Sequence, residues 1–268
     1  MTPLMGMRSV FQGWRLPFAA LGLIVIVSLL GALAAPYDPL AEVGESLGPP
    51  SSVHPFGTDL IGRDVFSRVL HGGGRTLFIA ALAVVCSVLP GMLIGLAAGY
   101  MGRRLDAALT AILDALLAIP ALLVALSVVA LTGSGPAQVA LAVGISGLPA
   151  CARITRAATR TARAMPHVEA ARGLGARPVH ILAFHVLPGI AGPVIAFVGI
   201  TLSWAILHAA TLNFLGFGGD PAAPEWGAML AEGRQVYRVA PWVAVAPGAA
   251  IMITLFTVNL LADALRRR

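Results

Sequence analysis

The sequence predicts an all-α protein that crosses a membrane several times. Of its 268 residues, 58% are hydrophobic and 11% are charged, whereas soluble domains carry about 25% charged residues. The mean hydropathy is +0.87. Six apolar stretches come close to the ~20 residues that a helix needs to cross the hydrocarbon core. A surface so poor in charge is expected to face lipid or other apolar helices, so we predict a polytopic membrane protein with six transmembrane helices.

The six predicted spans follow one another along the whole chain. In order, they are Leu16–Ala35, Leu77–Tyr100, Ala107–Leu131, Ala137–Ala152, Ile190–Phe214 and Val239–Ala262. The first contains Ala32-Leu33-Ala34, a pattern that could also end a cleaved signal peptide. Signal-peptide cores run about 7–15 residues and this stretch is longer, so we favour a retained anchor.

Arginines predict the orientation, because short cytoplasmic loops carry an excess of basic residues. With both termini in the cytoplasm, 13 of the 18 arginines lie inside and 5 outside. Residues 1–15 are then a cytoplasmic N-terminus, 16–35 the first transmembrane helix, and 36–76 an outside loop. Val65, Phe66, Val69 and Leu70 recur there at helical spacing, as in a short helix lying on the membrane surface. Residues 77–268 form a five-helix core with a cytoplasmic loop at 153–189, and residues 215–238 form a turn-rich outside loop.

The cytoplasmic loop begins with a stripe of four arginines on one helix face, Arg153, Arg156, Arg160 and Arg163. This stripe could meet anionic lipid headgroups or another protein. Pro166 and Glu169 then indicate a helix start, and Gly175 indicates a left-handed helix end. A second short helix is expected over Val179–Val186. The loop is thus predicted to be a helix–turn–helix outside the membrane, with a small-residue face suited to a groove on a partner.

Glu169-Ala170-Ala171, followed by Gly175 and by Leu187-Pro188, resembles the EAA loop of ATP-binding-cassette (ABC) importer permeases. The resemblance implies the type I ABC importer permease fold. It also implies that the helix from Glu169 to Gly175 is a coupling helix that fits a cleft in a separate ATPase subunit. Gly173 departs from the pattern by placing an extra glycine inside this helix.

Further motifs narrow the resemblance to the dipeptide, oligopeptide and nickel permeases, and within them to the C-type subunit. They are HPFGTD (54–59), GRDVFSR (62–68), FLGFG (214–218) and PEWG (224–227), with Asp106, Asp114 and Pro120 in the third span. The family usually continues past the last span with an acidic tail, whereas this chain stops at Arg266-Arg267-Arg268.

The resemblance implies a transporter subunit rather than an enzyme, in a bacterial cytoplasmic membrane. The implied partners are a second homologous permease, two ABC ATPase subunits, an extracytoplasmic solute-binding protein and the lipid bilayer, with no nucleic acid. The chain contains no lysine, so it cannot form a P-loop. ATP and Mg²⁺ are therefore expected on the ATPase subunits, with no cofactor, metal site or catalytic residue in this chain. Di- or oligopeptides are the expected cargo, and nickel, alone or chelated, is the alternative.

Several other residues have competing interpretations. Asp114 is an intramembrane acid, which by default indicates function; the family match favours hydrogen bonding or gating over ion coupling. Gly91, Gly95 and Gly99 form a ridge for helix packing, within the subunit or against a second permease, or else line the pathway. His180 and His185, five residues apart, should point about 140° apart on an α-helix and are no i, i+4 metal pair. The two cysteines, Cys86 and Cys151, are expected to be buried hydrophobes.

Two rival functions have some support in the sequence. Gly144-Ile145-Ser146-Gly147 is a GxSG motif, so Ser146 with His208 as base would suit an intramembrane serine protease. An ion-driven secondary transporter is the other rival, but such folds often contain internal repeats and this sequence has none that we detect. Neither rival accounts for the linked motifs above.

Overall fold

The computed structural model describes residues 33–266 and, before them, residues 19, 22, 24, 26–28, 30 and 31. The predicted N-terminal segment 1–15, much of the predicted first span and the last two arginines lie outside the described residues. The described chain is helical, and its extended pairing consists of two isolated β-bridges. In order, the helices are α2 (Val65–Tyr100), α3 (Arg103–Leu117), α4 (Ala121–Thr132), α5 (Pro136–Arg163), α6 (Pro166–Gly173), α7 (Pro178–Ile181), the π-helical turn η1 (Leu182–Val186), α8 (Leu187–Phe214), α9 (Trp226–Val236) and α10 (Trp242–Arg266).

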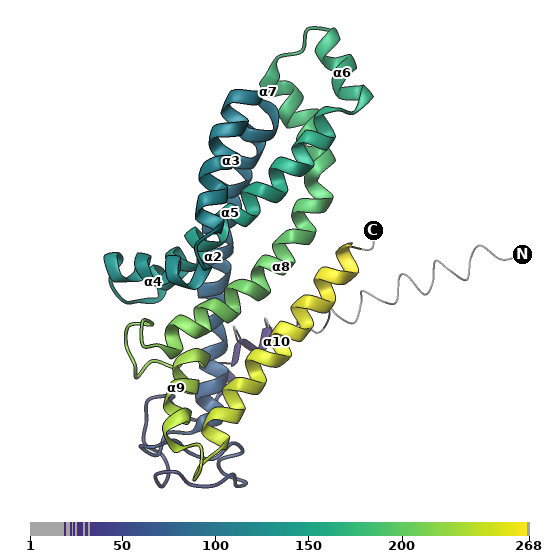
Figure 1. Cartoon of the computed structure of the whole chain (residues 1–268). Coiled ribbons are helices and arrows are strands. Elements are labelled where there is room, and N and C mark those ends of the chain that lie inside the picture. The colour runs from purple at the N-terminus through teal and green to yellow at the C-terminus, as the bar shows by residue number, and fades with distance from the viewer. Residues whose placement is uncertain are drawn as a thin grey trace, which may run out of the picture.

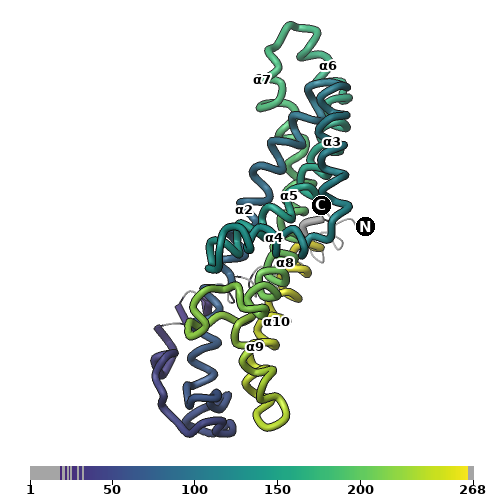
Figure 2. Tube along the Cα trace, turned by 60° about the vertical axis from the view of Figure 1, so that its left-hand side comes forward, coloured from purple at the N-terminus to yellow at the C-terminus, as the bar shows by residue number. Residues whose placement is uncertain are grey.

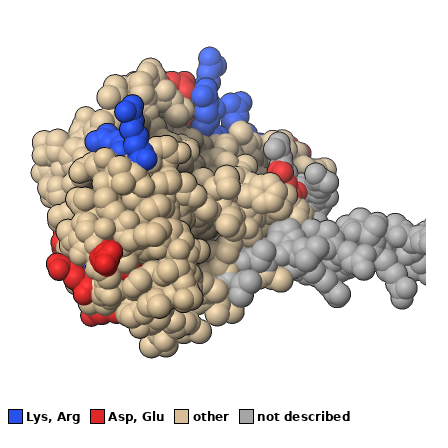
Figure 3. Space-filling view, turned by 90° about the horizontal axis from the view of Figure 1, so that it is seen from below, with Lys and Arg blue, Asp and Glu red and all other residues tan. Residues whose placement is uncertain are grey.

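The molecule is elongated, with different elements gathered at its two ends (Figure 1). One end holds α6 and α7, and we call it the α6 end. The other holds residues 36–64 and α9, and we call it the loop end. The turned view keeps the same two ends (Figure 2). Seen from the loop end, most of the surface is uncharged and the charged side chains lie in a few groups (Figure 3).

Four of the described helical segments are long and apolar enough to cross a membrane: Val65–Tyr100, Pro136–Arg163, Pro178–Phe214 and Trp242–Ala264. Helices α3 and α4 pass the same test only as a pair, bent by 89°. The fold class is therefore the predicted all-α membrane fold, and five of the six predicted spans have counterparts in these helices.

The predicted third span, Ala107–Leu131, is not one continuous helix. The chain leaves α3 after Leu117, and Pro120 precedes the first residue of α4 with an extended ψ of 128°. A proline ring clashes with the preceding helical turn and removes a backbone donor, and the residue before it is pushed away from helical geometry. The sharp bend follows from this proline.

The predicted surface helix at Val65–Leu70 is instead the first part of α2, which runs on without a break to Tyr100. The intervening Gly72-Gly73-Gly74 would weaken an isolated helix. Here Gly72 and Gly73 lie against the indole of Trp226, where added Cβ atoms would come within 3.1 Å and 3.0 Å of it. Close packing across the fold thus outweighs the low helix propensity of glycine.

The turn-rich segment 215–238, predicted as an outside loop, also contains a helix that the sequence analysis missed, α9. Glu225 caps it: the Glu225 carboxylate accepts hydrogen bonds from the Ala228 backbone N–H (3.0 Å) and from the Thr76 hydroxyl (2.7 Å). Burial raises the pKa of Glu225, against the effect of these hydrogen bonds. The PEWG motif therefore begins a helix and ties it to α2.

Two hydrophobic clusters hold the helices together. The larger joins α2, α4, α5, α8, α9 and α10 through buried residues such as Ile79, Val143 and Ile206. The smaller lies toward the α6 end and joins α5, α6, α7, η1 and α8 through Ala162, Val168, Ile181, Val186, Ile190 and Val194. The element with the predicted coupling motif thus rests on its own small core.

Candidate functional site

The predicted coupling helix exists as α6, which begins at Pro166 and carries Glu169 in its first turn. Val168 is fully buried in the smaller cluster, and Ala171 packs against that cluster. Glu169 and Ala170 are exposed on the other side. The helix therefore has an anchored face and a free face, and the first two residues of the EAA motif lie on the free face.

The end of α6 has the geometry predicted for Gly175. Its φ is +80°, in the left-handed region that favours glycine. The Gly175 N–H donates to the Arg172 carbonyl (3.0 Å), and the Ala176 N–H donates to the Ala171 carbonyl (3.1 Å). These two bonds form a Schellman motif, which satisfies the last carbonyls of the helix. Gly175 is thus the residue that ends α6.

The segment from Pro178 to Phe214 differs from the predicted separate short helix followed by a span. It is helical throughout, and η1 lies immediately before Leu187 and Pro188. In η1 the Leu187 N–H donates to the Leu182 carbonyl, five residues back. Proline lacks the N–H for the normal bond and crowds the carbonyl four residues earlier, so a widened turn lets the helix continue through Pro188. Leu187 and Pro188 are both exposed.

The same π turn changes the arrangement of the histidines. The ring centroids of His180 and His185 are 5.8 Å apart, and those of His167 and His185 are 6.3 Å apart. The predicted angle of about 140° is wrong because a π turn pairs residues five apart. Among the described residues, no group of three or more His, Cys, Asp or Glu side chains is placed to hold a metal ion.

Three members of the arginine stripe, Arg153, Arg156 and Arg160, pair with acids of α3, and Arg160 lies 3.7 Å from Asp106. Arg156 holds both carboxylate oxygens of Asp106, with an Nη2–Oδ2 distance of 2.9 Å. Arg153 lies 3.4 Å from Asp114, and both of these side chains are exposed. Asp114 is therefore in an ion pair within the chain. The sequence analysis assigned both sets of residues but did not pair them.

The glycine ridge packs inside the subunit. Gly91, Gly95 and Gly99 lie against α5, where a Cβ at Gly95 would come within 2.5 Å of the Ala152 carbonyl oxygen. A Cβ at Gly99 would come within 2.7 Å of the Thr159 Cβ. These contacts match the interpretation of the ridge as a packing surface and identify α5 as its partner.

The GxSG serine and the candidate base each bond to their own helix. The Ser146 hydroxyl donates to the Val143 carbonyl (2.9 Å). His208 Nδ1 lies 3.0 Å from the Trp204 carbonyl, and its ring stacks on the Trp204 indole. A nucleophilic serine needs a base within hydrogen-bond reach, and these contacts are those of side chains that pack.

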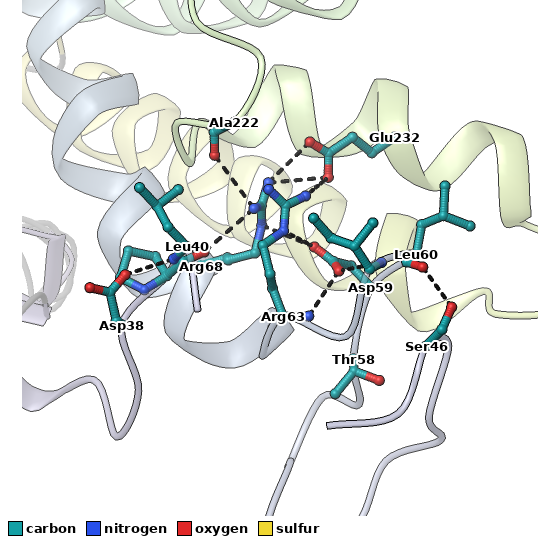
Figure 4. Close-up of polar contacts among 12 residues, drawn as sticks. Asp38, Leu40, Ser46, Thr58, Asp59, Leu60, Arg63, Arg68, Ala222 and Glu232 are labelled. Atoms are coloured by element: carbon teal, nitrogen blue, oxygen red, sulfur yellow. Dashed lines mark hydrogen bonds and ion pairs between the residues drawn. The ribbon is translucent and has the colours of Figure 1, made fainter. Parts of the chain in front are cut away.

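At the loop end, the GRDVFSR motif forms a buried ionic network (Figure 4). Arg63 pairs with Asp59 (2.6 Å) and Glu232 (3.1 Å), and Arg68 pairs with Glu232 (3.1 Å) and Asp59 (3.6 Å). The Arg68 side chain is 1% exposed. Burial raises the pKa of Glu232, while Arg68 and Arg63 counteract that effect. The network joins residues 36–64 and α2 to α9, and sequence reasoning missed Glu232 because it lies over 160 residues away in the chain.

A second polar cluster caps α2. The Asp64 carboxylate accepts from the backbone N–H and the hydroxyl of Ser67, both at 2.7 Å, and lies 3.0 Å from His54 Nδ1. The Trp242 indole N–H donates to the Thr58 carbonyl (3.1 Å). The HPFGTD and GRDVFSR motifs thus fold as one unit that fixes the loop onto α2 and the start of α10.

Solved structures of ABC transporters share the fold. The chain matches a subunit of the MetNI methionine ABC transporter in an inward-facing conformation with a TM-score of 0.61, at 18% identity, over 75% of this chain and 95% of that one. An amino acid ABC transporter crystallised with histidines gives a TM-score of 0.58 at 19% identity, covering 75% and 94% of the two chains. The fold is therefore the one found in these ABC transporter chains.

Sequence comparisons establish the family. Residues 91–268 match the family described as binding-protein-dependent transport system inner membrane component. The Di/tripeptide transport system permease protein DppC of Pseudomonas aeruginosa is 39% identical over 251 residues, 91% of this chain and 83% of the relative. The glutathione transport system permease protein GsiD of Pectobacterium atrosepticum is 42% identical over 217 residues, 81% and 72% of the two chains. The chain belongs to the binding-protein-dependent transport system inner membrane component family, and its relatives are ABC importer permeases.

Proposed function

We propose that this chain is one permease subunit of an ATP-driven, binding-protein-dependent importer of short peptides. The observation that carries the proposal is the 39–42% identity, over most of the chain, to permeases named for di/tripeptides and for glutathione, itself a small peptide. Family membership disfavours both the protease and the secondary transporter. The cargo is the finer part of the proposal, because the family includes several cargoes.

The proposed coupling site is α6 with the turns around it: Glu169 and Ala170 on its free face, Ala171 at the edge of the small core, and Gly175, Leu187 and Pro188 in the turns. Exposed apolar side chains lie close by in the chain, with Leu174 89% exposed and Phe184 68% exposed. An ATPase subunit docked there would bury these side chains. Val168 fixes α6 to the small core that also contains Ile190 of α8, so a displacement of α6 would be transmitted to a membrane helix.

The transport cycle follows from this arrangement. A solute-binding protein delivers peptide at the loop end, and a second homologous permease completes the pathway. Two ATPase subunits bind ATP and Mg²⁺ and close, moving the α6 helices of the two permeases. A ligand shifts a conformational equilibrium only through its different affinity for the two states, and ATP supplies that difference on the partner chains. This chain carries no covalent step.

The proposed placement is the bacterial inner membrane, with the α6 end and both termini in the cytoplasm. The α6 end carries the arginine stripe, and acidic residues such as Glu42, Glu45 and Asp220 belong to the loop end. Basic residues favour the cytoplasmic side. The geometry is compatible with this placement, since residues 153–189 and the two predicted outside loops lie at opposite ends (Figure 1).

The test is uptake in cells that lack the chain, compared with cells complemented by it at equal expression of the partner subunits. Labelled dipeptide, glutathione and nickel ion are compared in parallel. Uptake of either peptide that depends on the chain supports the proposal. Nickel uptake alone would identify the chain as a permease of a nickel importer, which is the alternative. Uptake of none of the three would contradict the proposed cargo.

Coupling is tested separately with Gly175→Pro and with deletion of Glu169–Gly175. Both changes destroy the end of α6, so uptake should be lost while the subunit still inserts into the membrane. Normal uptake at normal membrane levels would refute the assignment of α6 as the coupling helix.

A further inference from the structure

A basic cavity of about 430 Å³ lies near the α6 end, where α2 and α5 end and α3 begins. Its walls are formed mainly by Gly99, Gly102, Arg103, Asp106, Arg160 and Arg163. Its volume falls within the range of pockets that hold small ligands. The proposed coupling mechanism does not use it.

The charge of the cavity is unbalanced. Three arginines and one aspartate line it, so three positive charges minus one negative leave a formal charge of +2. Asp106 is held by Arg156 through both oxygens and also pairs with Arg160, at 3.7 Å. The single acid is therefore shared between an arginine outside the cavity and Arg160 of the lining, while the salt bridges of the described residues include neither Arg103 nor Arg163, so positive charge in the lining remains available to an anion.

The start of α3 adds to this positive potential. Gly102, with φ +110°, precedes the helix without a side-chain cap, and Arg103 is the first helical residue. The first backbone N–H groups of a helix lack internal partners and carry a partial positive charge. Arginines at this end oppose the helix dipole, and an anion in the cavity would offset both effects.

The cavity lies at the end of membrane-spanning helices. Helix α2 ends at Tyr100, and the Arg163 and Arg172 guanidinium groups lie 5.7 Å and 6.0 Å from the centre of the Tyr100 ring. Tyrosine is enriched where a span meets the headgroup layer. Because the first arginine of the lining follows Tyr100 by only three residues, the cavity is expected at the depth of lipid phosphates.

We infer that this cavity binds the phosphate of an anionic phospholipid of the surrounding membrane. Guanidinium groups bind phosphate oxygens through paired hydrogen bonds. Basic pockets between transmembrane helices on the cytoplasmic side bind anionic headgroups. Free phosphate or an acidic segment of a partner protein could also supply an anion. The position of the cavity at the end of two spans favours a lipid as the ligand.

The experiment measures lipid binding by the full-length chain purified with its co-expressed partners. The complex in detergent is titrated with phosphatidylglycerol or phosphatidylethanolamine, and bound lipid is counted by native mass spectrometry. Tighter binding of phosphatidylglycerol is expected. Each of Arg103→Gln, Arg160→Gln and Arg163→Gln should weaken it about five-fold, corresponding to roughly 1 kcal/mol for one basic residue near an anionic surface.

Arg104→Gln is the matched control, because it removes the same charge from the same helical turn outside the lining. It should change lipid affinity much less. Arg163→Lys, which keeps the charge but not the paired hydrogen bonds, should lie between wild type and Arg163→Gln. The melting temperature and the recovery of the complex are measured for every variant. Lipid affinities are compared only among variants that match the wild type in both, so a folding defect is separated from a binding defect.

Three results would overturn the inference. Equal losses in Arg104→Gln and in the lining variants would indicate a general basic surface. Displacement of phosphatidylglycerol by millimolar inorganic phosphate, with no preference for lipid, would indicate a free-phosphate site. Loss of ATPase subunits from the lining variants, with lipid binding unchanged, would indicate an acidic protein segment in the cavity.

Discussion

At the loop end, Asp59, Arg63, Arg68 and Glu232 pair with one another in a largely buried network that joins residues 36–64 and α2 to α9. At the α6 end, the helix is attached through Val168 and a small apolar cluster, and its other face is exposed. Buried ion pairs demand exact geometry and fail when one partner is lost, whereas apolar contacts tolerate small movements. The difference indicates a rigid loop end and an α6 end that a partner could move.

Removing Arg68 should give the largest loss of stability and break the rigid end. Arg68→Ala leaves Asp59 and Glu232 to share Arg63 alone, so one negative charge of the network loses its partner, and unpairing a buried charge costs about 3–5 kcal/mol. The midpoint of thermal unfolding in detergent should fall strongly, with reduced membrane levels. Arg75→Ala, two turns further along α2, is the control. Similar midpoints for the two variants would show that the network does not hold the loop end together.

Forcing α2 and α5 apart should cause the next largest loss of stability. These two helices run from the loop end toward the α6 end, so their contact connects the two regions. Gly95→Ala places a Cβ 2.5 Å from the Ala152 carbonyl oxygen, and such overpacking costs about 1–3 kcal/mol. Gly192→Ala is the matched control, since a Cβ at that helical position meets nothing within 4 Å. It should be neutral or stabilising by up to about 1 kcal/mol. Equal melting temperatures for the two variants would contradict the packing described here.

Gly175 and Gly173 offer a closely matched pair at the α6 end. Gly175→Ala forces a side chain into the left-handed region, at a cost of about 1–2 kcal/mol, and should weaken uptake with little change in global stability. Gly173→Ala adds a side chain in open space within the helix and should strengthen α6 by up to about 1 kcal/mol. Uptake and melting temperature are measured together. Equal uptake by both variants would show that the end of α6 does not contribute to coupling.

The sequence predicted the helices and their ends better than it predicted which residues contact one another across the fold. Pro166, Glu169 and Gly175 act locally, so α6 and its left-handed end could be predicted from a few residues. The continuation of α2 through Gly72 and Gly73 could not, because it depends on the Trp226 indole from α9. The π turn before Pro188 depends on backbone relaxation around proline, which an ideal helical angle ignores.

In the candidate site, too, the local motifs could be predicted from the sequence, whereas the long-range pairs could not. The EAA residues could be assigned from motif and spacing, and the structure adds which of them are anchored and which are exposed. The pairing of Asp106 with Arg156, and of Arg68 with Glu232, joins residues 50 and 164 positions apart. A single sequence contains no signal for such distant pairs beyond the scarcity of charge, which predicts that each buried ion has a partner without naming it.

The smallest effect is expected for Asp114, and it distinguishes a structural pair from an ion-coupling site. Asp114 and Arg153 are about half or more exposed and 3.4 Å apart, and such pairs contribute about 0–1 kcal/mol. Asp114→Asn and Arg153→Gln should each change the melting temperature only slightly, and the double variant should show a coupling energy of less than about 1 kcal/mol. Because ATP on partner chains is proposed to drive transport, peptide uptake by Asp114→Asn should keep its dependence on ATP and stay insensitive to a collapsed proton gradient. A variant that loses proton dependence present in the wild type would instead assign Asp114 to ion coupling.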